Sequence, residues 1–358
     1  MMLKRISAGI LALCCLVCFA GCSHLPWGDP DVSSSEPPVP SSTDPYSRSS
    51  LAPSSVVIPD YSADITKTVD FVLDNTDCRC DPAFAALTLE ITQNVGTDVG
   101  YALLPRMIAG EMNVSTAKSI AQYAVAAVIY GADPAIYVEG LDMVAALQRM
   151  QSAYGWFSAT PVDAPAEPET VPDAPENAEE DTFWSILALS LCNAEFDEES
   201  ACAWLLSRQH RDGGFGNDSS LSYVAYTGMA LTALSFCTCD DAKEVFNGAV
   251  SYLLSAYNEQ GFFVSSDTSS VATARDQAMG IAGVIAAGEN IYAPRWIRNG
   301  RNMVDGLLTF RAESGCFDLT EGDVTDSNIA LFALWCAQNG GLVFRNYQRP
   351  DIPVEPAE

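Results

Sequence analysis

Two aspartates, Asp323 and Asp326, have the spacing expected of an acid that donates a proton. Three residues apart, they share one face at a helix start, and neighbouring carboxylates raise each other's pKa. The same position also fits a structural role, because Asp326 precedes Ser327-Asn328-Ile329 and would cap the following helix by accepting backbone N–H bonds. Asp181 and Asp276 occupy similar places, which favours capping.

A second set of aromatic and polar residues stands at the starts of apolar helical runs. If these runs form a ring of helices, the set would face the mouth of its cavity, where aromatic walls and a few polar groups commonly bind a small molecule. The alternative is that they pack against apolar neighbours. The candidate ligand-binding residues are Trp184, Tyr223, Tyr226, Arg275, Asp276 and Asn328.

Other catalytic chemistry is poorly represented. The chain has only two histidines, His24 and His210, and lacks a Gly-x-Ser-x-Gly elbow, a phosphate-binding glycine loop with lysine, and a serine near a histidine. Cys78-Arg79-Cys80 and Cys237-Thr238-Cys239 would make a four-thiolate site if the fold joined them, but their spacing is tighter than zinc sites use. We expect buried free thiols, no metal and no cofactor.

The elements that must position these residues are helices. Apolar residues recur three and four apart, whereas alternating strand patterns are not evident. With weaker runs at 99–108 and 329–335, this periodicity predicts twelve helices. The clearer runs are 65–73, 84–91, 120–129, 138–150, 184–191, 201–206, 224–234, 245–254, 278–285 and 303–310.

An internal repeat links these helices into pairs. A Gly-x-Phe motif ends at Phe157, Phe215, Phe263 and Phe317, and each copy is followed by a helix of smaller residues. We expect the glycine to take the left-handed conformation that closes a helix, and the phenylalanine to fold back onto the neighbouring pair. Ala- and Gly-rich helices suit an inner ring and bulkier helices, such as 202–206, an outer one.

The motif Gln209-x-x-Asp212-Gly213-Gly214-Phe215 resembles the QW-type repeat of squalene and oxidosqualene cyclases and the equivalent turn of protein prenyltransferase β subunits. The likeness is clear over 140–340, whereas 61–139 shares only the helical pattern. It implies an all-α fold, an α/α toroid of about six helix pairs in a closed ring. That superfamily also contains non-enzymes, such as cobalamin carriers and complement-like thioester domains.

The chemical signatures of these relatives are missing. Prenyltransferases bind zinc through Asp, Cys and His. The two histidines of this chain lie in the tether and in the repeat turn, so the sequence does not support such a zinc site in a central cavity. The thioester motif Cys-Gly-Glu-Gln is absent at Cys336-Ala337-Gln338-Asn339. Hopene-type cyclases protonate an alkene with Asp-x-Asp-Asp, approached here only by Asp323 and Asp326. The sequence therefore favours a non-catalytic ligand-binding or interaction module, with a terpenoid cyclase-like or isoprenoid-transferring enzyme as the alternative.

The first residues indicate export. Lys4 and Arg5 precede an apolar stretch, 6–20, too short to span a membrane. Phe19-Ala20-Gly21-Cys22 resembles the bacterial lipobox, which implies acylation of Cys22 and a lipid anchor on the outer face of the cell membrane. We therefore assign 1–22 to a lipoprotein signal peptide, with cleavage without lipidation as the alternative.

Composition divides the rest of the chain. A Ser/Pro-rich tether covers 23–60, the toroid 61–345 and a tail 346–358, and an acidic Pro/Ala insertion at 160–181 is predicted to be disordered. The formal charge of -28 opposes binding to nucleic acid. The expected partners are the membrane, through the lipid, and a small apolar ligand, a glycan or another surface protein.

Overall fold

The computed structural model describes residues 58–75, 81–93, 115–159, 173–218, 221–265, 271–317 and 324–350. All of them belong to one compact unit, Ser55–Glu358. The described ranges contain eleven α-helices, two short 3-10 helices and one two-stranded hairpin. None of the helices in these ranges is long and apolar enough to cross a membrane. The predicted helix at 99–108, the leader, Cys22 and the Cys78-Cys80 pair lie outside the described residues.

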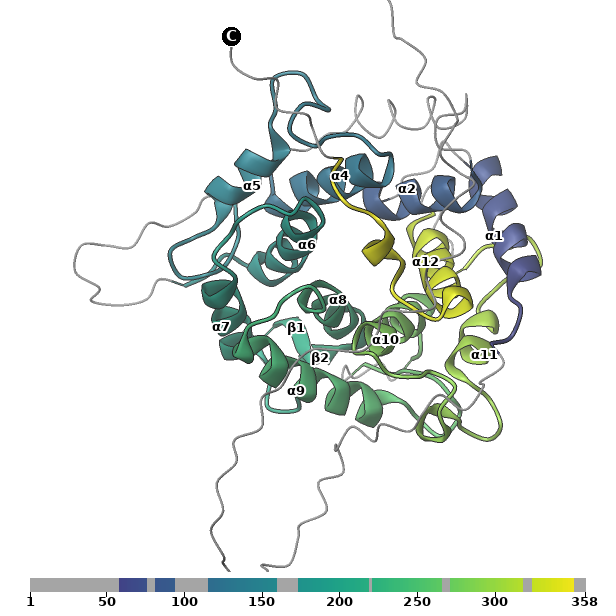
Figure 1. Cartoon of the computed structure of the whole chain (residues 1–358). Coiled ribbons are helices and arrows are strands. Elements are labelled where there is room, and N and C mark those ends of the chain that lie inside the picture. Colours follow the sequence, from purple (N-terminus) through teal and green to yellow (C-terminus); the bar gives the residue numbers. More distant parts are fainter. Residues whose placement is uncertain are drawn as a thin grey trace, which may run out of the picture. The chain divides into compact units, whose positions relative to one another are not determined.

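Six helices form a closed inner ring in which each packs on the next and the last packs on the first (Figure 1). Small residues allow the close approach that this ring needs: a Cβ added to Gly228 would lie 2.1 Å from the Met279 carbonyl oxygen of the neighbouring helix. The inner helices are α2 (Pro82–Ile91), α4 (Ala117–Ile129), α6 (Ala178–Leu191), α8 (Val224–Leu234), α10 (Ala274–Ala286) and α12 (Thr325–Asn339).

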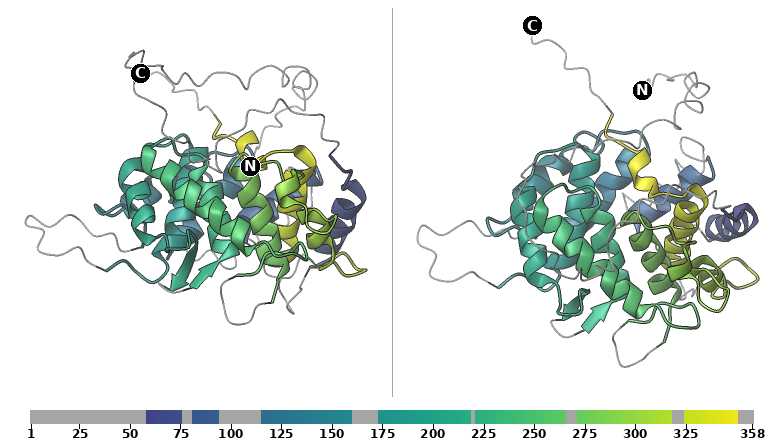
Figure 2. Two further views of the ribbon diagram at one scale, coloured as in Figure 1. Left: turned by 90° about the horizontal axis from the view of Figure 1, so that it is seen from below. Right: turned by 60° about the horizontal axis from the view of Figure 1, so that its bottom comes forward.

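A second layer of helices surrounds this ring (Figures 1 and 2). Each outer helix buries one stripe; the first, for example, buries Ile65, Thr68, Val69 and Val72, whereas the inner helices are buried on almost every side. The outer helices are α1 (Ser62–Asp74), α5 (Met143–Met150), α7 (Glu198–Arg208), α9 (Asp240–Ala256) and α11 (Met303–Leu308). As predicted, the helices rich in small residues lie in the inner ring, and the bulkier run 202–206 lies in the outer helix α7.

The repeat glycines join one outer helix to the next. Gly155, Gly213, Gly261 and Gly315 all have positive φ. A Cβ on Gly213, after α7, would lie 2.2 Å from the carbonyl oxygen of Gly248 on α9, and one on Gly315, after α11, would lie 2.3 Å from that of Lys67 on α1. The expected left-handed conformation is confirmed, and it is the glycine backbone that contacts the neighbouring outer helix.

The position of these glycines corrects one prediction. They do not cap the helices, which end several residues earlier; Gly155, for instance, follows the C-cap Gln151 of α5 and lies in a turn closed by the Gly155 N–H to Ser152 carbonyl bond. The glycine is required because the turn brings its backbone against the next outer helix.

Each repeat phenylalanine is anchored by a hydrogen bond from its backbone N–H to a buried side chain at the start of an inner helix. These bonds measure 2.9 to 3.0 Å and join Phe157 to Thr182, Phe215 to Thr227, Phe263 to Gln277 and Phe317 to Ser327. All four acceptor residues are fully buried. Each turn is therefore tied to the inner helix that follows it as well as to the next outer helix.

Aromatic side chains meet inside the ring. Phe84 on α2 contacts Trp184 on α6, with ring centroids 5.6 Å apart, although α4 stands between these two helices in the ring. Phe332 on α12 and Phe344 on η2 (Val343–Asn346) extend the cluster, with ring centroids 5.4 Å and 6.5 Å from that of Phe84 and 4.9 Å from each other. At most 3% of each side chain is exposed. The protein's own side chains therefore fill the ring at this level.

A segment that we call the C-terminal strap, residues 342–349, follows α12 and crosses the carboxyl-terminal ends of the inner helices. Arg345 donates to the Ser235 carbonyl after α8 (3.0 Å), and Arg349 forms an ion pair with the buried Asp133 after α4 (2.7 Å). The strap carries Phe344 into the aromatic cluster. The predicted toroid boundary at 345 is therefore wrong, because the ring's contacts continue to Arg349.

Three further boundaries differ from prediction. Residues 178–181 form the first turn of α6 and not the end of a disordered insertion; 160–172 lie outside the described residues. The run at 138–150 starts as a loop, with α5 beginning at Met143. A hairpin of β1 (Phe215–Asp218) and β2 (Leu221–Tyr223), which alternation did not reveal, precedes α8.

Candidate binding site at the amino-terminal ends of the inner helices

The polar residues at the starts of the inner helices meet one another across helix boundaries. First-turn side chains of α6 reach α4, those of α10 reach α8, and those of α12 reach α10. This happens because the inner helices bring the same end to one side of the ring. We call this set of first-turn residues the polar rim: Lys118, Glu179, Glu180, Asp181, Tyr223, Tyr226, Arg275, Asp276 and Asp326.

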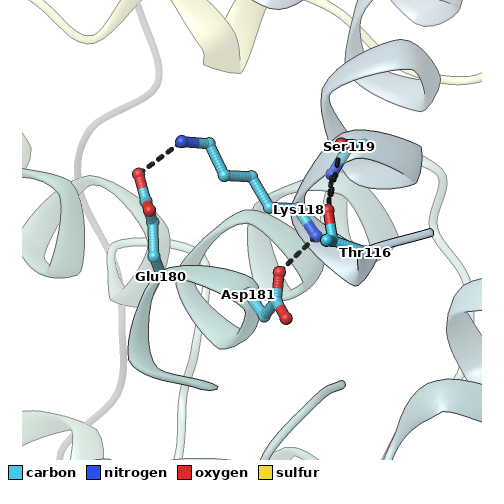
Figure 3. Close-up of polar contacts among 5 residues, drawn as sticks. All are labelled: Thr116, Lys118, Ser119, Glu180 and Asp181. Carbon is cyan, nitrogen blue, oxygen red and sulfur yellow. Dashed lines mark hydrogen bonds and ion pairs between the residues drawn. The ribbon is translucent and has the colours of Figure 1, made fainter. Parts of the chain in front are cut away.

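Asp181 and Glu180 of α6 hold the start of α4 (Figure 3). The Asp181 carboxylate accepts a hydrogen bond from the Lys118 backbone N–H at 2.7 Å, while Lys118 Nζ pairs with Glu180 at 2.6 Å. Thr116 caps the same helix by accepting from the Ser119 N–H. Burial raises the pKa of Asp181 to about 6, against the lowering effect of the Lys118 N–H bond. Asp181 can therefore change protonation near neutral pH.

Glu179 lies on the other side of the α6 start. Its carboxylate is almost fully buried and pairs with Arg208 Nε at 3.1 Å. Burial raises the pKa of Glu179, and the Arg208 guanidinium opposes that rise. Each of the two α6 glutamates is thus paired with a cation of a different helix, Glu180 with Lys118 of α4 and Glu179 with Arg208 of α7.

Tyr223 and Tyr226 supply the aromatic part of the polar rim. Their ring centroids are 6.1 Å apart, with planes at 47°, and both side chains are partly exposed. Burial, followed by the nearby negative charges of Glu180 and Glu179, raises the pKa of Tyr226 to about 12. The pair therefore presents ring faces, and Tyr226 a neutral hydroxyl group, near the α6 carboxylates.

Asp326 and Asp276 both contact neighbouring inner helices. Asp326 forms an ion pair with Arg275 at 2.6 Å, and α12 has no side-chain cap hydrogen bond. Asp276 accepts from the Ala225 N–H of α8 at 3.0 Å, whereas Thr273 caps the helix of Asp276. Asp326 is not the N-cap residue of α12 that the sequence predicts, because the helix begins at Thr325 and Val324 holds that position. Asp323 lies outside the described residues.

Two of the predicted ligand-binding residues lie inside the ring. Trp184 is 3% exposed and packs edge-on against Phe84. Asn328 is 1% exposed; it accepts from the Thr88 hydroxyl of α2 and donates to the Val324 carbonyl. They join helices, whereas Tyr223, Tyr226, Arg275 and Asp276 stay at the polar rim. Sequence reasoning missed Lys118, Glu179 and Glu180; their position around the acidic start of α6 was the available signal.

A serine does lie beside a histidine, contrary to expectation from the sequence. His210 Nδ1 is 2.9 Å from Ser222 Oγ, which donates to Asp212 Oδ1 at 2.7 Å. Ser222 is 1% exposed, and its proton points to the carboxylate and not to the imidazole. This arrangement ties the repeat turn to the β2 strand and leaves no accessible nucleophile at Ser222. Among the residues with described positions, no group of three His, Cys, Asp or Glu side chains is arranged to hold a metal ion.

Comparisons with known proteins bear on the fold. No family model matches the chain, and no curated protein does. Among solved structures, the type II terpene cyclase MstE from Scytonema in its apo form aligns with a TM-score of 0.55 and 13% identity, over 78% of this chain and 99% of that one. The unsaturated glucuronyl hydrolase from Bacillus sp. GL1 aligns at 0.51 and 14%, over 78% and 96%.

The chain has the α/α toroid fold. A further structure, titled "UGL_D88N/dGlcA-Glc-Rha-Glc", matches with a TM-score of 0.53 and 14% identity, over 78% of this chain and 96% of that one. Identities this low carry the architecture and no chemistry. The toroid, inferred from a repeated turn and the count of helical runs, is confirmed.

Proposed function

We propose that this toroid is a non-catalytic binding protein of the cell surface, anchored to the outer face of a membrane by lipid on Cys22, and that its polar rim binds a glycan. The filled centre carries this proposal. Phe84, Trp184, Phe332 and Phe344 pack against one another inside the ring and are buried. The polar rim combines partly exposed aromatic rings with charged hydrogen-bonding groups.

A glycan suits this combination of groups. Sugars present apolar ring faces and hydroxyl groups together, and a partly exposed tyrosine pair offers faces for the former. Glu180 and Lys118, which are each about 30% exposed, offer an acceptor and a donor for the latter. One structural neighbour is described together with an oligosaccharide, dGlcA-Glc-Rha-Glc, which supports a sugar as the ligand.

A glycan array probed with the purified full chain tests the proposal. We expect binding to at least one oligosaccharide, and Tyr226→Ala should weaken it about tenfold, because burying an aromatic face contributes ~1.5–3 kcal/mol. Ile136→Ala is the control, since this residue is 74% exposed in the loop after α4, away from the first turns. Absence of glycan binding, or equal loss in both variants, would contradict the proposal.

The alternative is a terpenoid cyclase-like or isoprenoid-transferring enzyme that uses Asp323 and Asp326. The likeness to MstE favours a cyclase architecture. Against it, the Arg275 guanidinium beside Asp326 favours the ionised carboxylate, whereas protonating an alkene requires the neutral acid. Incubation with squalene and with geranylgeranyl diphosphate decides between them. A cyclised product that Asp326→Asn abolishes would replace the binding proposal.

A further inference from the structure

Three cysteines gather on the outer side of the ring, where α7 meets the loop that joins α8 to α9. Cys202 is fully buried in α7, and Cys237 and Cys239 are partly buried in the loop. The Cys202 side chain is in hydrogen-bonding contact with both loop thiols. By contrast, no other cysteine is among the groups that perturb the pKa of Cys192, which follows α6, or of Cys336 in α12.

The backbone of the loop is held against the same face of α7. Glu198 Oε1 accepts hydrogen bonds from the Thr238 N–H at 2.6 Å and the Cys239 N–H at 3.0 Å. Glu198 precedes Cys202 by four residues, so the two side chains lie on one face of the helix. The contact of α7 with α9 supports this arrangement from the other side of the loop. Main-chain hydrogen bonds thus position the loop thiols independently of the thiol contacts.

We propose that Cys202 and Cys237 form a disulfide in the mature protein, with Cys239 as a free third thiol. The step removes two electrons and two protons from the paired thiols. A disulfide oxidant, either a protein disulfide of an oxidising compartment or a small-molecule disulfide, takes them up and becomes two thiols. The bond would covalently join α7 to the connection between α8 and α9. Export, which the leader predicts, would expose the thiols to such an oxidant.

Peptide mapping of the full chain, purified from cells that process its own leader and alkylated before lysis, tests the proposal. We expect a cross-linked peptide pair containing Cys202 and Cys237, while Cys192 and Cys336 are alkylated only after denaturation. Because Cys237 and Cys239 share a tryptic peptide, single variants assign the partner. Cys239→Ala should retain the cross-link in full, Cys237→Ala should lose it, and Cys192→Ala is the matched control.

A second arm separates thiol geometry from compartment. The reduced, purified full chain is incubated with oxidised glutathione, and pairing is followed over time. We expect the Cys202–Cys237 cross-link to form before any other, and the urea midpoint of unfolding to fall when it is reduced again. A cross-link to Cys239, or complete alkylation of Cys202 after both arms, overturns the proposal. The glycan array reports on the polar rim and is read separately.

Discussion

The Asp181 carboxylate of α6 accepts a hydrogen bond from the backbone N–H of Lys118 in α4, so one inner helix caps another. Asp276 does the same for Ala225 of α8. Capping across the ring satisfies an N–H group that a helix start leaves without an intrahelical partner, and it also fixes the register between neighbouring helices. Asp181 and Asp276 therefore each act on the inner helix beside their own.

The raised pKa of Asp181 predicts a pH dependence of stability. The folded carboxyl titrates at about 6 and the unfolded one near 3.8, so between these values the folded state holds more protons. Its contribution to stability should fall as pH rises through this window, by at most about 1.4 kcal/mol per unit. Asp181→Asn should remove this fall while keeping the bond to Lys118. Urea unfolding between pH 4 and pH 7 measures it.

Asp197 provides a control of opposite sign. Hydrogen bonds from Ser200 lower the pKa of Asp197, so its contribution is present above the unfolded pKa and is lost as pH falls. Asp197→Asn should leave the fall at higher pH untouched. An unchanged pH profile in Asp181→Asn would show that its burial does not perturb its titration.

Gly213→Ala should destabilise the ring by more than ~2 kcal/mol. A left-handed residue with a Cβ costs roughly 1–2 kcal/mol, and here that Cβ would also meet the Gly248 carbonyl oxygen. Gly300 has φ +77 with nothing within 4 Å of an added Cβ, so Gly300→Ala should show the conformational term alone. The urea midpoints of unfolding of the two variants measure these losses of stability. Equal losses would show that contact with the next outer helix does not make Gly213 necessary.

Thr227→Val should cost about 1–3 kcal/mol, because the buried Phe215 N–H loses its acceptor. Thr232→Val is the matched control. The Thr232 hydroxyl is equally buried but donates only to the Gly228 carbonyl of its own helix, so its loss strands no N–H group. Thermal unfolding of both variants is the measurement, and Thr227→Ser should restore most of the loss.

Phe344→Ala should cost ~3–5 kcal/mol and open a cavity inside the ring. Its ring contacts those of Phe332 and Phe84, and the side chain is fully buried. Xenon or benzene uptake by the variant in a crystal would detect the cavity, since an apolar void of this kind binds such ligands. A variant as stable as the parent, with no uptake, would mean that the neighbours collapse into the space.

Cys22→Ala should release the protein from the membrane or leave it unprocessed, if the 6–20 stretch is the proposed leader, since it is shorter than a membrane span requires. Fractionation of cells and medium, with metabolic labelling by a fatty-acid analogue, follows anchor and cleavage together. Replacing Cys18, which lies within the leader, is the control. Unchanged membrane retention with normal processing would contradict lipidation at Cys22.

The ring could be predicted because its determinants are local and repeated. The turns ending at Phe157, Phe215, Phe263 and Phe317 recur along the chain, and helical periodicity places a helix on either side of each. Composition misled at 178–181, where three acidic residues extend a polar run although they begin a buried helix. The burial of α6 depends on which helices pack around it, and local composition carries no information about those neighbours.

The polar rim was only partly predictable. Arg275 and Asp326 were both candidates, but their ion pair joins residues 51 apart and depends on the relative height of two helices. The C-terminal strap has no periodicity, and its Arg349 reaches Asp133 across the ring. Trp184 has the residue type of a ligand-binding wall, yet its side chain is buried and packs against the chain's own Phe84.

The ring closes between α1 and the last helices. The Tyr61 N–H donates to Gln338 of α12, Arg311 pairs with Asp64 of α1, and the turn at Gly315 lies on Lys67. Elsewhere in the described ring, neighbours follow one another along the chain. Contacts of such long sequence separation form late, because a large loop must close first. A chain released before residue 324 should therefore expose the unpaired apolar sides of α1 and α2, and such truncated chains should aggregate or be captured by chaperones.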